Sequence, residues 1–183
     1  ISERVFHGQS QFPDDAGRIE FAIAWPEDGE GFVHSYCNTI PTPQGGTHEQ
    51  GLRSVLARGM RQYGEMAGIK KANMITPDDV MSGASIMLSV FIPDPQFQGQ
   101  TKEKLASAHV TRLVDTAIKD SFDHWLSAAP QASEKLLENM IERAEERQRR
   151  KESRVMARKS ATKKLRLPGK LADCSRADAD DTE

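Results

Sequence analysis

The run ASIMLSVFI at residues 84–92 limits the fold most narrowly, because it is apolar at almost every position. A strand with one solvated face would alternate apolar and polar side chains, whereas this run predicts a middle strand covered on both faces. Three earlier runs, RVFHGQSQF, RIEFAIAW and GFVHSYCNTI, are separated by the turn-forming segments DDAG and EDGEG. We expect these three runs to form antiparallel strands.

Helical patterns follow the strand-like runs. Thr47 and Gln50 have the spacing of a capping box, which predicts a helix that begins there and ends near Gly68. The apolar stripe of this helix consists of Leu52, Val55, Leu56, Tyr63 and Met66. Arg53 and Arg61 lie outside that stripe.

Further helices are expected in the second half of the chain. Thr76-Pro77-Asp78-Asp79 opens a short helix with a cap residue, a proline and first-turn acids, and Gly83 would end it. A longer helix has its apolar stripe at Val110, Leu113, Val114, Ala117, Ile118, Phe122, Trp125 and Leu126. After Pro130, another helix carries an apolar face formed by Leu136, Leu137, Met140, Ile141 and Ala144. Beyond Arg147 this face fades, so we expect a solvated rod that the LPGK segment at 167–170 breaks.

Charge is distributed unevenly along the chain. Between Arg143 and Lys170 there are twelve Lys or Arg and three Glu, although the whole chain has a formal net charge of -2. Taken alone, such a run is most often the solvated face of a helix. The alternative is an electrostatic footprint for nucleic acid, and the run itself does not decide between the two.

These elements predict an α+β fold in three regions: a sheet-and-helix domain at 1–130, a basic exit helix at 131–166 and a linker at 167–183. A chain of 183 residues with 37% hydrophobic content can bury a real core. It begins without a methionine and stops in the acidic run DADDTE, so we expect a piece of a longer protein. It lacks a signal-peptide layout and a stretch of about 20 apolar residues, so we expect a cytoplasmic location. Cys37 and Cys174 are interpreted as free thiols.

Local signatures of catalysis and metal binding are missing from the sequence. The patterns GxxxxGK[ST], GxGxxG, CxxC and HExxH do not occur. The histidines are scattered, and each is interpreted as a surface or capping residue: His7, His34, His48, His109 and His124. We therefore expect no metal site and no catalytic centre on this chain alone.

Three stretches are hard to explain by folding alone. TPQGGTH places two glycines before a helix, which suits an anion, although a tight turn would need the same residues. DPQFQGQTK presents an amide, a hydroxyl and the ammonium of Lys102 within three positions, a set suited to a phosphate, although a lone surface lysine is far commoner. LPGKLADC is a compact junction whose chemistry the residues do not specify. Physical reasoning on these stretches ends at a possible phosphate contact.

The ordered set SYCNTIPTPQGGTHEQGLR, SVFIPDPQFQGQTKEKL and LPGKLADC resembles the transducer region of the ATPase subunit of bacterial type IIA DNA topoisomerases. This family contains the B subunits of gyrase and of topoisomerase IV. The residues of the motifs resemble those of topoisomerase IV B subunits more closely than those of gyrase. The resemblance extends from about Tyr36 to Cys174, and the first thirty-five residues match only in strand pattern. Three motifs in the family order make it specific.

The resemblance implies roles for three residues. Gln100 and Lys102 would reach the ATP site of a neighbouring ATPase domain and contact the γ-phosphate, with ATP and Mg²⁺ held mainly by that domain. Arg53 would face the cavity that receives a transported DNA segment. The implied fold is that of ribosomal protein S five domain 2, with a left-handed βαβ unit.

The resemblance also implies a parent enzyme, an ATP-dependent DNA topoisomerase of the bacterial cytoplasm and nucleoid that acts in chromosome segregation. Its implied partners are DNA, its own ATPase and TOPRIM cleavage domains, the A subunit of topoisomerase IV and, on ATP binding, another copy of the ATPase subunit; no membrane is implied. The fragment alone would couple ATP hydrolysis to strand passage without hydrolysing ATP. The alternative is a stand-alone nucleic-acid-binding module of the same fold, whose binding would depend strongly on salt.

Overall fold

The computed structural model of the chain describes residues 4–26 and 31–164, with side chains described as far as residue 158. The chain divides into two compact units, Ile1–Glu145 and Glu146–Glu183. The first unit therefore extends beyond the predicted limit at residue 130. The reason is that Leu137 and Met140 are fully buried in its core. The predicted linker at 167–183, including LPGKLADC and Cys174, lies outside the described residues.

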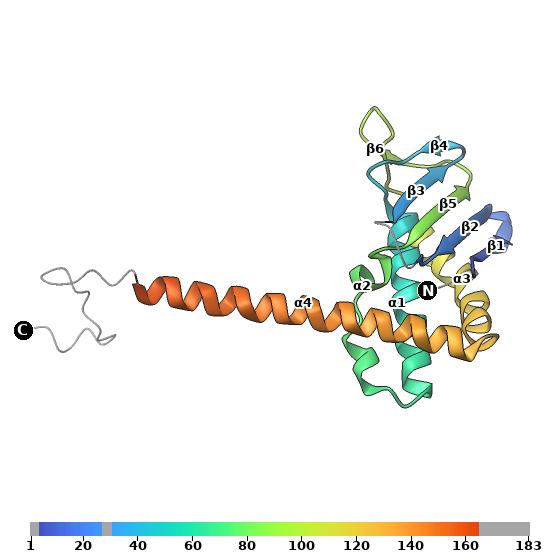
Figure 1. Cartoon of the computed structure of the whole chain (residues 1–183). Helices are drawn as coiled ribbons and strands as arrows, with labels where there is room; N and C mark the ends of the chain where they lie inside the picture. The colour runs from blue at the N-terminus through green and yellow to red at the C-terminus, as the bar shows by residue number, and fades with distance from the viewer. Residues whose placement is uncertain (1–3, 27–30, 165–183) are drawn as a thin grey trace, which may run out of the picture. The chain divides into compact units, whose positions relative to one another are not determined.

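The first unit is built on a five-stranded sheet in the order β1-β2-β5-β3-β4 (Figure 1). Its strands are β1 (Phe6–Gln11), β2 (Arg18–Ala24), β3 (Phe32–Cys37), β4 (Ile40–Pro41) and β5 (Ser85–Phe91). β2 pairs antiparallel with β1 and with β5, whereas β3 pairs parallel with β5 and antiparallel with β4. The three predicted strands are present and alternate in direction, but β2 and β3 are not neighbours, because β5 lies between them.

The central strand β5 is covered on one face only. Ile86, Leu88 and Val90 are buried, whereas the side chain of Met87 is 50% exposed. The expectation of cover on both faces is wrong for the described residues. Ser85 and Ser89 lie on the outward face and interrupt the apolar run, as polar side chains do on the solvent face of a half-buried strand.

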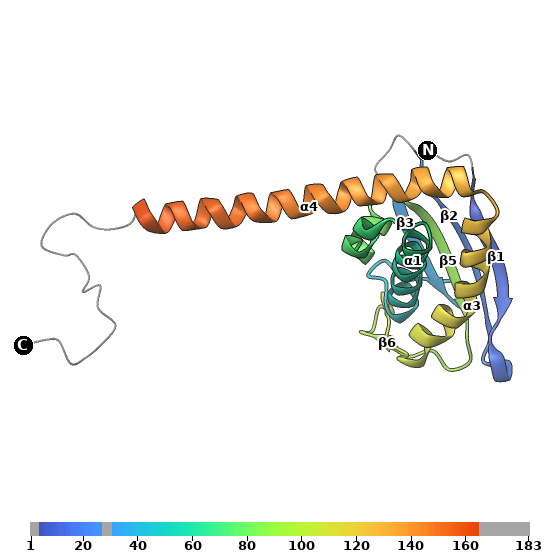
Figure 2. The ribbon, with the colours of Figure 1, turned by 90° about the horizontal axis from the view of Figure 1, so that it is seen from below.

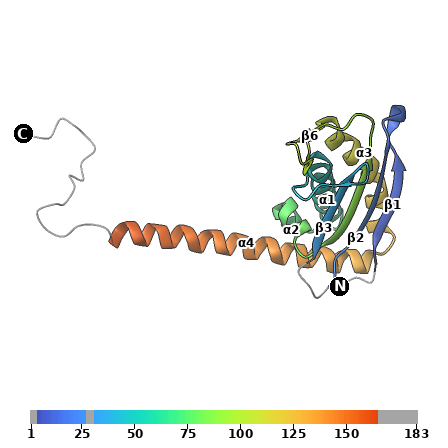
Figure 3. The same cartoon turned by 90° about the horizontal axis from the view of Figure 1, so that it is seen from above.

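Two helices, α1 (Thr47–Met66) and α3 (His109–Ser127), lie side by side against the covered face of the sheet (Figure 2 and Figure 3). They approach closely where α1 carries glycine. A Cβ at Gly51 would lie 2.5 Å from the Thr111 carbonyl oxygen, and one at Gly59 would lie 2.6 Å from the Phe122 ring. The close approach of the two helices therefore depends on the missing side chains of these glycines.

The helix α1 begins as the sequence predicts but by a different device. Gly46 is its N-cap and no side chain caps the helix, so the capping box predicted at Thr47 and Gln50 is wrong. The hydroxyl of Thr47 is buried and has no hydrogen-bond partner within the described part of the chain. At the other end, Met66 is 70% exposed and does not continue the predicted apolar stripe.

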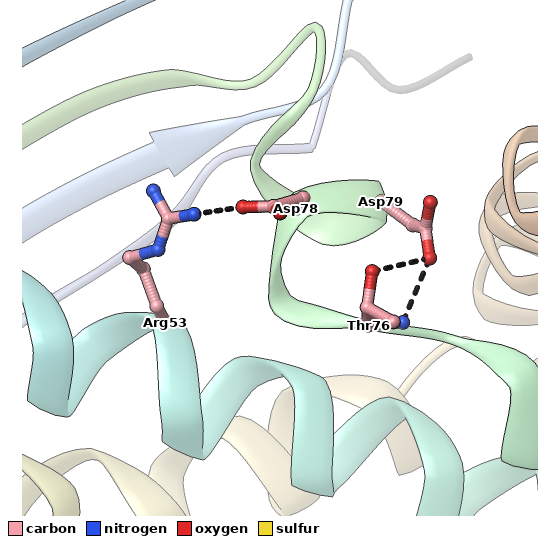
Figure 4. Close-up of polar contacts among 4 residues, drawn as sticks. All are labelled: Arg53, Thr76, Asp78 and Asp79. Atoms are coloured by element: carbon pink, nitrogen blue, oxygen red, sulfur yellow. Dashed lines mark hydrogen bonds and ion pairs between the residues drawn. The ribbon is translucent and has the colours of Figure 1, made fainter. Parts of the chain in front are cut away.

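The connection from α1 to β5 holds η2 (Lys70–Met74) and the short helix α2 (Pro77–Met81). The predicted cap residue Thr76 is the N-cap of α2, and with Asp79 it forms a capping box. The backbone N–H and the hydroxyl of Thr76 donate to Asp79 Oδ2 at 2.8 and 2.7 Å (Figure 4). A third short helix, η1 (Pro13–Asp15), connects β1 to β2.

The last helix is α4 (Pro130–Lys164). Its apolar residues from Leu136 to Ala144 are buried. From residue 148 to residue 158 every side chain is exposed. The helix thus changes from an amphipathic segment in the first unit to a solvated, basic segment in the second, as the fading apolar stripe indicates.

Candidate functional site

The segment that contains Lys102 forms a separate hairpin. Strands β6 (Phe97–Gln98) and β7 (Lys104–Leu105) pair antiparallel, and residues 99–103 form the loop at the top of Figure 1. Gly99 and Lys102 have left-handed backbone, with φ of 80° and 55°. The sequence predicts this loop at the end of the buried strand, but the structure places it on a two-stranded hairpin that follows β5.

The loop presents its polar side chains to solvent. Gln100, Thr101 and Lys102 are all exposed. The Lys102 ammonium lies 5.8 Å from the centroid of the Phe97 ring, and within the described part of the chain it makes no ion pair. A compact, mobile cation without a carboxylate partner is suited to contact an incoming anion.

The root of the hairpin is hydrogen-bonded to the segment that precedes α1. The N–H of Gln44 donates to the Glu103 carbonyl at 3.0 Å, and the N–H of Leu105 donates to the Gly45 carbonyl at 3.0 Å. The Gln44 side-chain amide donates to Glu103 Oε2 at 2.5 Å. The two stretches that the sequence singles out separately, TPQGGTH and DPQFQGQTK, are therefore neighbours.

The glycine pair before α1 is explained by this contact. Gly46 has a φ of 141° and forms an isolated bridge with Leu105. A Cβ at Gly46 would lie 2.3 Å from the Leu105 carbonyl oxygen, and a Cβ at Gly45 would lie 2.5 Å from Glu49 Oε2. The Glu49 carboxylate thus occupies the first turn of α1, where an anion would otherwise bind. The geometry favours the tight-turn interpretation of TPQGGTH.

A buried polar cluster lies beneath this turn. The hydroxyl of Ser35 donates to Glu49 Oε1 at 2.6 Å and lies 2.7 Å from Thr42 Oγ1. The same Thr42 oxygen lies 3.1 Å from His48 Nε2. Burial lowers the pKa of His48 from 6.5 to about 4, so the ring is neutral. Hydrogen bonds in this cluster attach the start of α1 to β3.

The interpretation of His48 as a surface or capping residue is wrong, since the residue is fully buried. Its spacing carried a usable signal. His48 precedes Leu52 by four positions and Val55 by seven, which places it on the apolar stripe of α1. The other four histidines are exposed.

Arg53 lies outside the apolar stripe of α1, as the sequence predicts, but it is engaged. Its guanidinium pairs with the carboxylate of Asp78 in the first turn of α2 (Figure 4). The Arg53 side chain is 36% exposed. The second arginine off the stripe, Arg61, donates to the carbonyl of Ile75 at 3.1 Å. Among the described residues, no hydrogen bond or ion pair connects Arg53 to the hairpin loop.

The basic run divides between the two units. Arg143 belongs to the first unit and donates to the Ser82 carbonyl. In the second unit Arg150 pairs with Glu146, and Gln148 donates to Glu152 at 3.0 Å. These are contacts between residues four apart on one helix face and contribute little to stability each. The run therefore presents exposed positive charge along the helix.

Other kinds of site are absent from the described residues. Residues 4–26 and 31–164 contain no group of three His, Cys, Asp or Glu that could hold a metal ion. In the same residues, no helix is long and apolar enough to cross a membrane. Cys37 is a free, buried thiol, and burial raises its pKa to about 11.

Solved structures share this fold. The ATP-binding domain of topoisomerase IV from Francisella tularensis, in complex with a small-molecule inhibitor, superposes with a TM-score of 0.72 at 34% identity; the match covers 79% of this chain and 40% of that one. The 43K ATPase domain of Thermus thermophilus gyrase B, in complex with an aminocoumarin, gives a TM-score of 0.73 at 25% identity, covering 85% and 42%. The fold is thus one found in the ATPase regions of type IIA topoisomerases.

Sequence comparison identifies the family. The profile of the DNA gyrase B family matches residues 1–156, so this chain belongs to the DNA gyrase B family of type IIA topoisomerase B subunits. The B subunit of DNA topoisomerase 4 from Rickettsia prowazekii is 53% identical over the whole chain, and the protein of that name from Bartonella bacilliformis is 52% identical over 98% of it. The chain spans 28% and 26% of the length of these two relatives.

Proposed function

We propose that this chain is the transducer segment of a topoisomerase IV B subunit, and that its hairpin loop senses the γ-phosphate of ATP bound in another domain of that protein. The observation that carries the proposal is the exposed Lys102 ammonium at the tip of a hairpin, without a carboxylate partner in the described residues. Gln100, two positions earlier, adds an amide donor. Family membership and the topoisomerase IV relatives support the proposal.

Contact with a phosphate would give the loop two states, one with the γ-phosphate bound and one after hydrolysis has removed it. A charge-assisted hydrogen bond from Lys102 exists while the γ-phosphate is present and is lost when hydrolysis removes it. The loop then relaxes, and the domains that the contact held together change orientation. This action needs no general base on the chain, so ATP turnover and Mg²⁺ binding are assigned to the rest of the B subunit. We expect the chain alone not to hydrolyse ATP.

The proposed transducer has the fold of ribosomal protein S five domain 2. The relevant unit is β3, α1 and β5, because β3 and β5 are parallel neighbours connected through α1. We expect a left-handed crossover. In the parent enzyme the partners would be DNA, the A subunit of topoisomerase IV and a second copy of the B subunit, all in the cytoplasm during chromosome segregation.

The test uses the whole B subunit that carries this segment. Lys102→Ala should lower the ATPase rate by about 10²-fold, the usual cost of removing one donor to a transition-state charge. Gln100→Ala should have a smaller effect in the same direction. Lys104→Ala is the matched control, because Lys104 belongs to the same hairpin but lies in β7, and its rate should stay near wild type. ATP turnover by Lys102→Ala within twofold of wild type would remove the phosphate role.

A second candidate function is nucleic-acid binding without energy coupling, which the exposed basic residues of α4 favour. Binding through phosphates would weaken steeply as salt rises, because each neutralised phosphate releases counterions. Titration of duplex DNA with this chain at two salt concentrations measures that slope. Tight binding by the chain, together with full ATPase activity of Lys102→Ala in the whole B subunit, would favour the second function over the first.

A further inference from the structure

The loop with Lys102 is held to α1 by contacts that the proposed phosphate sensing does not itself require. Gln44 contacts Glu103 twice, through its backbone N–H at 3.0 Å and its side-chain amide at 2.5 Å. Glu103 is the residue next to Lys102. Gln44 is two residues before Gly46, the N-cap of α1. The contact between Gln44 and Glu103 therefore joins the sensing loop to the helix start.

The side-chain contact also controls where a negative charge lies. A carboxylate one residue from Lys102 could pair with its ammonium or repel a phosphate that approaches it. The Gln44 amide holds the Glu103 carboxylate by a hydrogen bond instead. The Lys102 ammonium is then the charge at the loop tip that an approaching phosphate meets first.

At the Gln44 end of the contact, a movement of the hairpin would reach the start of the helix α1. The N–H of Gln50 donates to the Gly46 carbonyl at 3.0 Å and closes the first turn of α1. The helix is 20 residues long and carries Arg53 in its second turn. A displacement of Gly45 and Gly46 with the hairpin would therefore be transmitted along α1, because a helix moves as a unit more readily than it deforms.

We propose that Gln44 and Glu103 form a clasp, a pair of positioning residues that couples the state of the Lys102 loop to the first turns of α1. The inference rests on the proposed contact between Lys102 and the γ-phosphate. The clasp makes the helix start follow the loop when that contact forms or breaks. It also keeps the Glu103 carboxylate directed away from the phosphate.

Hydrogen exchange on the whole B subunit, with and without a non-hydrolysable ATP analogue, tests the coupling. In the wild type, the analogue should protect residues 99–103 and residues 47–53 together. In Gln44→Ala, protection of 99–103 should persist, while protection of 47–53 should fall about two- to tenfold, the range expected for one net hydrogen bond. Gln98→Ala removes an exposed amide from the same hairpin and should leave both regions as in the wild type.

An exchange of the two groups separates a positioning role from a merely structural one. In the double variant Gln44→Glu with Glu103→Gln, the amide and the carboxylate change places and the hydrogen bond can re-form. This variant should recover the protection of 47–53, whereas Glu103→Gln alone should not.

Each contrary result has a distinct meaning. One such result is that the analogue protects residues 47–53 as strongly in Gln44→Ala as in the wild type, and another is that the exchanged pair does not recover the protection. Either result would show that the proposed clasp is wrong, and the phosphate contact would stand. If the analogue leaves 99–103 unprotected in the wild type, the phosphate contact is wrong and the coupling falls with it.

Discussion

The guanidinium of Arg53 donates a hydrogen bond to Asp78 Oδ1, so a cation on α1 is paired with a first-turn carboxylate of α2 located 25 positions later in the chain. Asp78 is 77% exposed and Arg53 is 36% exposed. Such an exposed pair contributes about 0–1 kcal/mol to stability. A DNA phosphate that approaches Arg53 would compete with Asp78 for the same guanidinium.

This competition predicts opposite effects of the two partners on DNA-stimulated ATPase, measured in the proposed parent enzyme, a topoisomerase IV assembled from A and B subunits. Arg53→Gln should weaken the stimulation, because it removes the proposed contact of Arg53 with the DNA phosphate backbone. Asp78→Asn should strengthen it, because the arginine no longer has a competing carboxylate. Basal ATPase should change little in either variant.

The measurement compares ATPase with and without DNA at two salt concentrations, with Asp120→Asn as the control for loss of an exposed carboxylate on α3. If Arg53→Gln leaves DNA stimulation unaltered at both salt concentrations, Arg53 is an ordinary surface residue and the basic part of α4 is the remaining candidate for DNA contact.

The left-handed backbone at Lys102, with φ of 55°, predicts an unusual order of stability. A side chain with Cβ costs about 1–2 kcal/mol in this conformation, and glycine does not incur that cost. The free energy of unfolding of Lys102→Gly should therefore exceed that of Lys102→Ala by about 1 kcal/mol. In a urea titration, Lys102→Gly should unfold at the higher urea concentration. The same two changes at Thr101, which has no positive φ, should give the reverse order. Equal stability of the two Lys102 variants would mean that the loop relaxes freely.

The buried His48 predicts a pH dependence of folding. Burial lowers its pKa from 6.5 to about 4, so the unfolded chain binds a proton in this window that the folded chain does not. The free energy of unfolding should therefore decrease as pH falls below about 6.5, by at most about 1.4 kcal/mol per unit, until about pH 4. Urea titrations from pH 7 to pH 5 should show this slope in the wild type and a shallower one in His48→Gln. Parallel slopes would assign the dependence to other groups.

The close approach of α1 and α3 predicts that Gly51→Ala is destabilising even though alanine favours helix. A Cβ there would lie 2.5 Å from the Thr111 carbonyl oxygen. Overpacking of this kind costs about 1–3 kcal/mol, whereas the gain in helix propensity is at most about 1 kcal/mol. Ser54→Ala, on the exposed side of α1, should be neutral or slightly stabilising. A thermal midpoint of Gly51→Ala equal to that of the wild type would show that the two helices can separate without cost.

The sequence predicts those elements whose signal is local. The cap residue at Thr76 and the apolar stripe from Val110 to Leu126 are confirmed, because each depends on residues within one or a few turns. The similar pattern at Thr47 and Gln50 fails, because Gly46 is constrained by Leu105, a residue that is distant in sequence. Spacing alone does not reveal such a neighbour.

The same limit applies to the sheet and to the candidate site. Strand patterns have a period of two in parallel and antiparallel pairs alike, so they did not indicate that β5 lies between β2 and β3. The motifs located Gln100, Lys102 and Arg53, and family resemblance gave their proposed roles. The partners Glu103 and Asp78, at sequence separations of 59 from Gln44 and 25 from Arg53, required the structure.

The insertion of β5 between β2 and β3 also imposes an order on folding. The hairpin of β1 and β2 can form as soon as both strands exist, since they are adjacent in sequence and in space. The main partner of β3 is β5, which follows only after α1, η2 and α2. Closing so long a loop costs chain entropy before any pairing repays it, so the sheet should be completed late and in one step. On a ribosome, β3 would have to wait with an unpaired edge until β5 emerges, which makes this interval the one in which the nascent chain is most exposed to wrong pairing.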